Sequence, residues 1–414
     1  VLMSNILGII SEYNPFHNGH LYHLNESKKA THSDYAIAIM TGNFAQRGDA
    51  SIVDKWSKAR MAISNGIDLV IELPTIYSIS SAENFADGAI KILNSLNIID
   101  YLSFGSESGD ISVLNDIAEV LAKEPREYKT LLSHELSKGV SFPKAREKAL
   151  LMYLGDVRRF VNVLSSPNNI LGIEYLKSLK RQHSLIHPIT LKRKNVGYND
   201  NFLPANSRFA SASAIRNYCM SSDITELQRV MPENSYDILE DCIKKGNFVK
   251  NLSSFDKEII YTLRKMSTSE IANLPDVSEG LEFALKNAAN SCNSVIELLT
   301  LVDTKRYTKT RIQRILLYAI LGITKKDMQL SKTIIPYVRV LGFNSSGREL
   351  LGEISKRNPK LELVTSVKKF LDNSSNKNLK YILEKDIWAS NVYSLGFEYD
   401  SKANMDYTQK LITY

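Results

Sequence analysis

The stretch from Glu12 to His20 reads Glu-Tyr-Asn-Pro-Phe-His-Asn-Gly-His, and it decides how the surrounding sequence is interpreted. It follows the apolar run Ile6–Ile10 and precedes a helical pattern that begins near Leu21. Open parallel sheets bind ligands beyond the carboxyl ends of their strands, and a helix N-terminus offers free N–H groups to phosphate. Two imidazoles three residues apart, with Gly19 allowing close approach, can donate hydrogen bonds to phosphate oxygens as charge develops on them. This context favours a phosphate site over a His-x-x-His metal site or two incidental surface histidines.

Short apolar runs alternate with helical patterns through the first 110 residues. Two of the helical patterns are Leu21–Ala30 and Ser57–Gly66, and a further strand candidate, Leu185–Leu191, follows a helical insertion at about 111–182. Continuously apolar strands that alternate with helices predict a parallel sheet covered on both faces. Residues 1–220 are therefore expected to form an α/β domain of the nucleotide-binding type. Its first four strands are predicted at Ile6–Ile10, Tyr35–Met40, Asp68–Leu73 and Tyr101–Phe104.

The second half of the chain has a different pattern. From Ser222 to Gly322 the apolar residues recur at helical spacing, which predicts a mostly α-helical region over 221–414. A small βα segment is expected near 333–354, with a strand around Pro336–Phe343 and a helix around Gly347–Ile354. The boundary between the two regions is placed near residue 220.

Composition excludes several classes of protein. Of the 414 residues, 43% are hydrophobic and 23% charged, as in folded globular proteins rather than disordered ones. Apolar runs such as Ile315–Ile320 fall well short of the ~20 residues that a membrane span needs, and no signal peptide is expected around Leu7–Ile10. Three cysteines are too few for a disulfide framework or a metal cluster. We expect a cytoplasmic protein without a membrane partner, whose net charge of +7 permits a nucleotide or nucleic-acid partner.

The stretch at 12–20 resembles the HIGH-type motif of the nucleotidyltransferase superfamily, whose α/β fold is Rossmann-like. Further motifs follow in order and, together with it, resemble the bacterial tRNA(Met) cytidine acetate ligase family (TmcAL) over most of the chain. They are Thr-Gly-Asn-Phe-Ala-Gln-Arg-Gly at 41–48, Asp-Leu-Val-Ile-Glu-Leu-Pro at 68–74, Phe-Gly-Ser-Glu at 104–107, Ser-Pro-Asn-Asn-Ile-Leu-Gly-Ile-Glu-Tyr at 166–175, Lys-Arg-Lys at 192–194, Ser-Ala-Ile-Arg at 213–216, the basic stretch at 305–314 and Arg-Val-Leu-Gly-Phe at 339–343.

The resemblance implies a two-step reaction. Acetate attacks the α-phosphate of ATP to give acetyl-adenylate, and the wobble cytidine of elongator tRNA(Met) then takes the acetyl group to become N4-acetylcytidine. ATP would be the nucleotide substrate, and Mg²⁺ is expected to be held mainly by that nucleotide rather than by the protein. The implied ATP-binding residues are Ile10, Ser11, Glu12, Tyr13, Asn14, Pro15, Phe16, His17, Asn18, Gly19, His20, Leu21, Tyr22, His23, Gly105, Asn168 and Arg193, of which His17 and His20 would be catalytic.

Other polar residues are weaker candidates for this site. Arg47 and Lys55 follow the second predicted strand and are candidate phosphate or acetate contacts, although a solvated helix start would explain them equally well. Ser213 and Arg216 resemble a phosphate-binding turn of the wider superfamily, with a plain helix cap and an exposed arginine as the simpler interpretation. Glu72, at the end of a strand, could orient a helix or hold a metal-bound water.

A basic segment in the helical half is a candidate tRNA surface. No acidic residue occurs between Asp303 and Asp327, and an RNA backbone could follow such a patch, although a solvated helix face is the usual explanation. The candidate tRNA-binding residues are Lys305, Arg306, Lys309, Arg311 and Arg314.

Two other functions remain open. A small-molecule adenylyltransferase would use the same phosphate machinery with a different acceptor. A non-catalytic RNA-binding protein would have no chemical need for the pair His17 and His20 with Gly19 between them.

Overall fold

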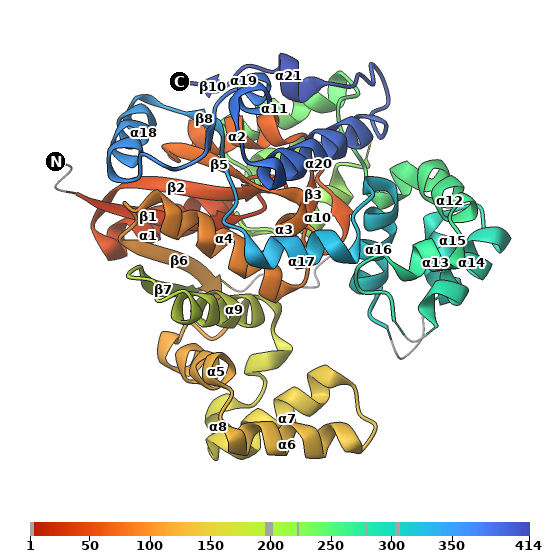
Figure 1. Ribbon diagram of the computed structural model, residues 1–414. Coiled ribbons are helices and arrows are strands. Elements are labelled where there is room, and N and C mark those ends of the chain that lie inside the picture. Colours follow the sequence, from red (N-terminus) through yellow and green to blue (C-terminus); the bar gives the residue numbers. More distant parts are fainter. Residues whose placement is uncertain (1–3, 195–201, 222, 279, 303–306) are drawn as a thin grey trace.

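The computed structural model describes residues 4–194, 202–221, 223–278, 280–302 and 307–414. Within them, one sheet of eight strands forms the centre of the molecule, with helices on both of its faces (Figure 1). Seven strands lie in the order β10-β8-β5-β2-β1-β6-β7, and β9 pairs with β8. The strands are β1 (Asn5–Ser11), β2 (Ser33–Thr41), β5 (Leu69–Leu73), β6 (Tyr101–Ser106), β7 (His187–Lys192), β8 (Val338–Phe343), β9 (Leu363–Val364) and β10 (Ile412–Thr413).

The strands predicted in the first half are all present and pair in parallel, as expected. Alternating side chains explain why both faces are covered, because successive residues of a strand point to opposite sides. In β2, Ile37 and Ile39 join one hydrophobic cluster, whereas Ala38 and Met40 join the other. A strand with apolar residues on both faces is stable only when helices cover both.

Each face of the sheet has its own set of helices. The helices α4 (Ala82–Leu96) and α9 (Pro167–Arg181) supply apolar side chains to the cluster of Ile37 and Ile39. The opposite cluster is completed by α1 (Asn18–Thr31), α2 (Lys55–Ser64), α10 (Ala212–Tyr218) and α11 (Glu233–Lys244). The helices α10 and α11 therefore already pack on the sheet, immediately around the boundary expected near residue 220.

Two helical lobes project from this centre (Figure 1). The part of the predicted insertion that precedes α9 forms the first lobe, and the second lobe lies beside α17 (Lys325–Thr333). The first contains α5 (Ile111–Lys123), α6 (Arg126–Ser137), α7 (Phe142–Leu154) and α8 (Val157–Phe160). The second contains α12 (Asp256–Lys265), α13 (Thr268–Ala272), α14 (Leu281–Ser291), α15 (Val295–Val302) and α16 (Lys309–Leu321). None of the described helices is long and apolar enough to cross a membrane.

The βα segment expected near 333–354 is present as β8 and α18 (Ser345–Arg357), but it belongs to the main sheet. Strand β8 pairs antiparallel with β5, and β10 then adds beyond β8. Between them the chain forms α19 (Val367–Asn373), α20 (Lys377–Ser394) and the short α21 (Met405–Thr408). The sheet therefore crosses the expected boundary, because the C-terminal part of the chain supplies its edge.

Candidate nucleotide-binding site

The turn from β1 into α1 fixes two histidine side chains by a reciprocal helix cap. His17 is the N-cap residue of α1, and its Nδ1 accepts a hydrogen bond from the N–H of Gly19 at 3.0 Å. The N–H of His17 in turn donates to Nδ1 of His20 at 3.2 Å. A ring nitrogen that accepts carries no proton, so each neutral imidazole carries its proton on Nε2. The cap therefore presents two N–H donors from one helix start.

The same two rings are stacked, and His17 is buried whereas His20 is half-buried. Their centroids lie 3.9 Å apart. Only glycine fits at position 19, because a Cβ there would come within 2.7 Å of Cε1 of His17. Burial, together with the nearby charges of Arg193 and Arg216, lowers the pKa of His17 to about 3. Burial and the neighbouring His17 also hold the pKa of His20 well below its usual value. Both imidazoles are therefore neutral donors at neutral pH, suited to charge that develops on a phosphoryl group.

Aromatic residues of the same stretch pack against the ring of His20. Tyr13 and Phe16 are almost completely buried, with ring centroids 4.8 Å apart, and Tyr13 meets His20 edge to face at 5.0 Å. On the next turn, His23 lies 3.1 Å from Oγ of Ser103, and burial lowers its pKa to about 4. Much of the predicted stretch from Ile10 to His23 therefore positions the two donors.

The ends of β6 and β7 meet the start of α9 at a second part of the site. Nη1 of Arg193 donates to Oδ1 of Asn168 at 3.4 Å, and Nδ2 of Asn168 donates to Oε1 of Glu107 at 2.8 Å. The other carboxylate oxygen of Glu107 accepts from the N–H of Asn169 at 2.9 Å. Gly105 leaves room for the Arg193 side chain, since a Cβ there would lie 3.3 Å from Cγ of that arginine. The structure thus brings Gly105, Asn168 and Arg193 together as expected.

Two further arginines lie near this site, Arg216 close to His17 and Arg47 close to Glu12 and Arg216. Arg216 on α10 donates from Nη1 to the backbone oxygen of Asn14 at 2.9 Å and from Nη2 to Oγ of Ser213 at 3.3 Å. The N-cap of α10 is Ser211, so Ser213 supports Arg216 instead of capping the helix. Arg47 lies at the turn between β3 (Phe44–Ala45) and β4 (Asp49–Ala50). Its pKa is lowered by partial removal from water and by Arg216 and Arg193, against the opposing effect of Glu12 and Glu107.

Lys55 does not join this cationic group. Its Nζ lies 2.9 Å from Oε1 of Glu72 and 2.8 Å from Oδ1 of Asp406, and its side chain is 1% exposed. This placement does not support the expected contact with phosphate or acetate, because the ammonium is enclosed by carboxylates. Of the two roles considered for Glu72, the structure supports the structural one.

Of the candidate tRNA residues, Arg311 and Arg314 bond within the protein, whereas Lys309 is exposed. Arg311 donates to the backbone oxygen of Asp276 at 2.9 and 2.6 Å, and Arg314 pairs with the carboxylate of the same residue at 3.3 Å. Lys309 is exposed at the start of α16, whereas Lys305 and Arg306 lie outside the described residues. Both arginines thus hold the turn before α14, a role that a run of basic residues does not reveal.

Sequence reasoning gave no role to two residues that organise the site. Glu107 stood in the quoted Phe-Gly-Ser-Glu motif, but its bonds to α9 depend on a segment 61 residues away. Lys58 is completely buried and donates to the backbone oxygens of Glu12 at 3.0 Å and Thr41 at 2.9 Å, which ties together the ends of β1 and β2. Burial lowers the pKa of Lys58 to about 7. A lysine on the first turn of a helix gives no sign in the sequence that it points inward.

The described residues contain no group of three or more His, Cys, Asp or Glu side chains that could hold a metal ion. Donors converge instead on one edge of the sheet, where β1 and β6 end. Two neutral imidazoles and three guanidinium groups at this position suit a polyphosphate, since forked N–H groups match phosphate oxygens.

Comparison with known proteins defines the class. The HIGH Nucleotidyl Transferase family model matches residues 4–409, so the chain is a member of that class. Within it, the chain belongs to the tRNA(Met) cytidine acetate ligase family. It is 45% identical to the tRNA(Met) cytidine acetate ligase of Thermoanaerobacter sp. (strain X514), over 98% of this chain and 99% of that protein. It is 44% identical to the enzyme of the same name from Acetivibrio thermocellus, over the same shares.

Solved structures agree with this assignment. The apo crystal structure of Thermotoga maritima TmcAL superposes with a TM-score of 0.93 at 34% identity and covers 99% of both chains. A second structure of that protein, bound with alpha-thio ATP, gives a TM-score of 0.91 at the same identity and coverage.

Proposed function

We propose that this protein joins acetate to tRNA(Met) in two steps driven by ATP. A carboxylate oxygen of acetate attacks the α-phosphorus of ATP and pyrophosphate leaves, which gives acetyl-adenylate. The exocyclic amine of the wobble cytidine then attacks the acetyl carbon, AMP leaves with the bonding electron pair, and the amine loses a proton. The observation that carries this proposal is the stacked pair of neutral imidazoles at the start of α1, with Arg193 and Arg216 beside them.

The two parts of the site have different tasks in this reaction. His17 and His20 donate from Nε2 to the α-phosphoryl group and to the departing pyrophosphate, which stabilises the charge that develops there. Gly105, Asn168 and Arg193 bind the nucleoside end or the adjoining phosphates. Arg47 and Arg216, which lie close enough to affect each other's charge, bind the outer phosphates. A cysteine nucleophile is not required, because adenylation itself supplies the leaving group.

Mg²⁺ fits this site only as a companion of the nucleotide. The two nearest carboxylates already accept hydrogen bonds from the backbone, Glu12 from Gln46 at 2.8 Å and Glu107 from Asn169 at 2.9 Å. When bound, the ion would neutralise part of the triphosphate charge. The residues described above bind and orient the phosphates beside it.

The acceptor is elongator tRNA(Met), and the predicted place of action is the cytoplasm, where ATP and tRNA occur together. The tRNA-binding residues Lys305, Arg306, Lys309, Arg311 and Arg314 remain predictions. The printed names of the relatives support tRNA(Met) and acetate as substrates. A small-molecule adenylyltransferase would share the phosphate site, and the difference lies entirely in the acceptor.

A labelling experiment tests this function. Purified protein is incubated with ATP, isotopically labelled acetate and tRNA, and the nucleosides are analysed by mass spectrometry. We expect label in N4-acetylcytidine that requires ATP and disappears in the His17→Ala variant. Protein that binds ATP and yet transfers no label to any nucleoside would favour the adenylyltransferase. Acetate-dependent ATP–pyrophosphate exchange measures the first step separately.

A further inference from the structure

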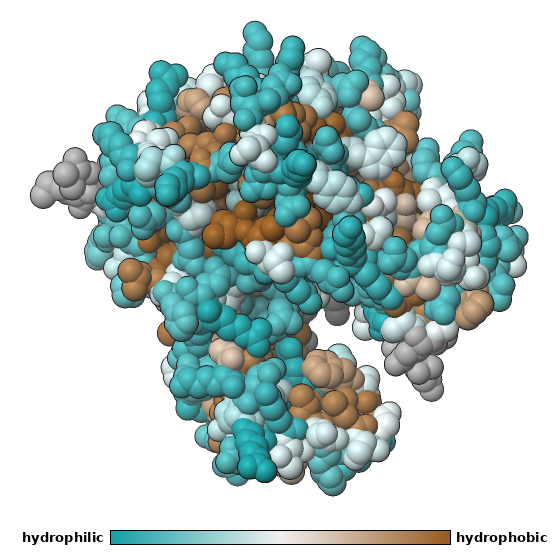
Figure 2. Space-filling model, in the orientation of Figure 1, coloured by the Kyte–Doolittle hydropathy of each residue, from teal (hydrophilic) through white to brown (hydrophobic). Residues whose placement is uncertain are grey.

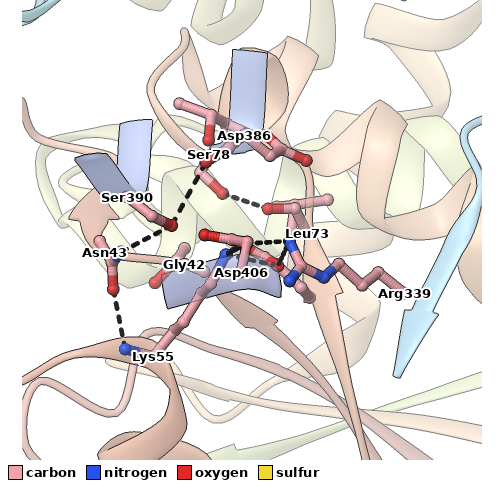
Figure 3. A network of polar contacts seen from close by, with 12 residues as sticks. Gly42, Asn43, Lys55, Leu73, Ser78, Arg339, Asp386, Ser390 and Asp406 are labelled. Atoms are coloured by element: carbon pink, nitrogen blue, oxygen red, sulfur yellow. Dashed lines mark hydrogen bonds and ion pairs between the residues drawn. The ribbon is translucent and has the colours of Figure 1, made fainter. Parts of the chain in front are cut away.

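A buried ionic cluster contacts the ends of the segment 42–54, which carries Arg47. We use the name ionic cluster for Lys55, Glu72, Arg339 and Asp406, whose side chains are at most 5% exposed (Figure 3). Lys55 pairs with both carboxylates, and Arg339 lies 3.2 Å from Oε2 of Glu72 and also pairs with Asp406. Glu72 and Arg339 are register partners across β5 and β8, and Asp406 comes from α21. Three parts of the chain that are distant in sequence thus meet at one point.

Stability alone does not explain such a cluster. Removing charges from water is costly, and well-packed apolar residues often replace a buried ion pair without loss of stability. Burial by itself would raise the pKa of Asp406, but Arg339 and Lys55 outweigh it and keep the carboxyl charged. The cluster therefore acts mainly by fixing the geometry of the residues that surround it.

The neighbours of the ionic cluster are the two ends of the segment 42–54. A Cβ on Gly42 would come within 2.6 Å of Oε1 of Glu72, so the chain leaves β2 in close contact with the cluster. The N–H of Lys55 donates to Oδ1 of Asn43 at 2.8 Å, and Nδ2 of Asn43 donates to Oγ of Ser390 on α20 at 3.2 Å (Figure 3). Helix α20 and the cluster together hold the base of this segment.

The outer side of the same segment contacts the nucleotide site. The N–H of Gln46 donates to Oε1 of Glu12, and the N–H of Ile52 donates to Oδ1 of Asn14, both at 2.8 Å. The backbone oxygen of Asn14 accepts from Arg216, which lowers the pKa of His17. The segment 42–54 therefore connects the C-terminal part of the chain to the stretch that contains the histidines, and Arg47 is carried between them.

We propose that Ser390 and Asp406 are positioning residues that hold Arg47 against the outer phosphates of bound ATP. Ser390 acts through Asn43, and Asp406 acts through Lys55. The inference rests on the proposed function, because it takes ATP as the ligand of this site. It assigns a role in nucleotide binding to residues that are nearly 350 positions away from the segment in sequence.

A double-mutant cycle tests the proposal with ATP as the titrated ligand. We expect Arg47→Ala to weaken ATP binding about 10- to 100-fold, as for loss of a charge-assisted hydrogen bond. Ser390→Ala should weaken it about 3- to 5-fold in the wild-type background, because the variant loses the hydroxyl that accepts from Asn43 and donates to the backbone oxygen of Asp386 at 3.3 Å. In the Arg47→Ala background, Ser390→Ala should have almost no effect, because the residue through which it acts is absent.

Ser394→Ala is the matched control. Ser394 is also buried on α20, one turn further along, but its hydroxyl bonds locally to the backbone oxygen of Asn391 at 2.9 Å. Both serine variants should unfold at similar temperatures, and only Ser390→Ala should weaken ATP binding. Asp406→Asn in the same cycle provides a second, stronger perturbation, with Tm showing that it folds.

The outcomes separate the two proposals. Equal effects of Ser390→Ala with and without Arg47, or no effect of Arg47→Ala on ATP binding, would overturn the positioning role. Coupled effects on ATP binding in a protein without acetate-dependent exchange would support the positioning role and remove the acetate step of the proposed function.

Discussion

His17 and His20 together cap the start of α1, and their rings stack with centroids 3.9 Å apart. In most helices a serine, threonine or aspartate side chain performs this capping. Here the capping atoms are the two Nδ1 nitrogens, so the structural hydrogen bonds determine which nitrogen of each ring remains free. The capping residues and the proposed catalytic donors are thus the same pair.

Replacing His20 by alanine should abolish most of the first step. The variant loses one Nε2 donor and the acceptor for the N–H of His17, so we expect acetate-dependent ATP–pyrophosphate exchange to fall at least 100-fold, about 2.7 kcal/mol of transition-state stabilisation. Binding of tRNA should stay within about 2-fold, which a filter-binding assay measures. A normal rate of exchange would remove His20 from the catalytic assignment.

The buried histidines also predict how stability depends on pH. The pKa of His17 is lowered from 6.5 to about 3 on folding, so the unfolded state binds more protons between these values. Its stabilising contribution is complete above pH 6.5 and is lost as the pH falls towards the folded-state pKa. Between pH 7 and pH 5 this loss should be about 2 kcal/mol for His17 alone.

Urea unfolding at the two pH values measures that loss. His17→Asn is the comparison, because asparagine is a good N-cap residue and does not titrate in this range. The variant should lose about 2 kcal/mol less than the wild type on acidification. Equal losses in both proteins would mean that His17 titrates normally in the folded state.

Glu107→Gln should weaken nucleotide binding more than it slows catalysis. The carboxylate accepts from Asn168 and Asn169, and an amide can accept at only one of its two positions. Asn168 and Arg193 would then be less firmly placed, and we expect KM for ATP to rise about 10-fold, the cost of about one hydrogen bond to a charged group. Asp110→Asn, three residues later at the N-cap of α5, is the control and should leave KM unchanged.

Alanine substitutions of Lys309 and Arg311 should have different effects, the first on tRNA binding and the second on stability. Lys309 is exposed, so its loss should reduce the slope of log K for tRNA against log salt by up to about 1 without changing the free energy of unfolding. Arg311 donates to Asp276 and to Ser278, so Arg311→Ala should cost about 1–2 kcal/mol of stability. An unchanged tRNA isotherm for Lys309→Ala would remove the start of α16 from the RNA surface.

Local pattern was sufficient for the strands and for α1, whereas the grouping of the 10–23 stretch with Gly105, Asn168 and Arg193 was implied by the family resemblance. Strand ends of a parallel sheet meet at one edge, so motifs that follow successive strands must come together. The partners of Lys55 and Arg311 could not be anticipated in this way. Asp406 follows Lys55 by 351 residues, and the oxygen of Asp276 precedes Arg311 by 35, and neither separation corresponds to a helical or strand period.

The position of strand β8 in the sheet could not be predicted from local pattern either. Its sequence predicts a strand followed by a helix, and both are present. Its position beside β5 depends on Val338 and Val340 being buried against the sheet and on the match between Glu72 and Arg339. Charge complementarity between two strands 267 positions apart becomes visible only after the chain has folded.

The ribosome makes Lys55 long before it makes Asp406. Until the last part of the described chain has emerged, Lys55 and Glu72 have neither Arg339 nor Asp406 beside them, and β5 has no neighbour on its outer edge. If the proposed positioning role holds, the segment that carries Arg47 reaches its final geometry only after Asp406 has been made. A nascent chain in which α1 and its two histidines have already formed would not yet hold ATP as the finished protein does.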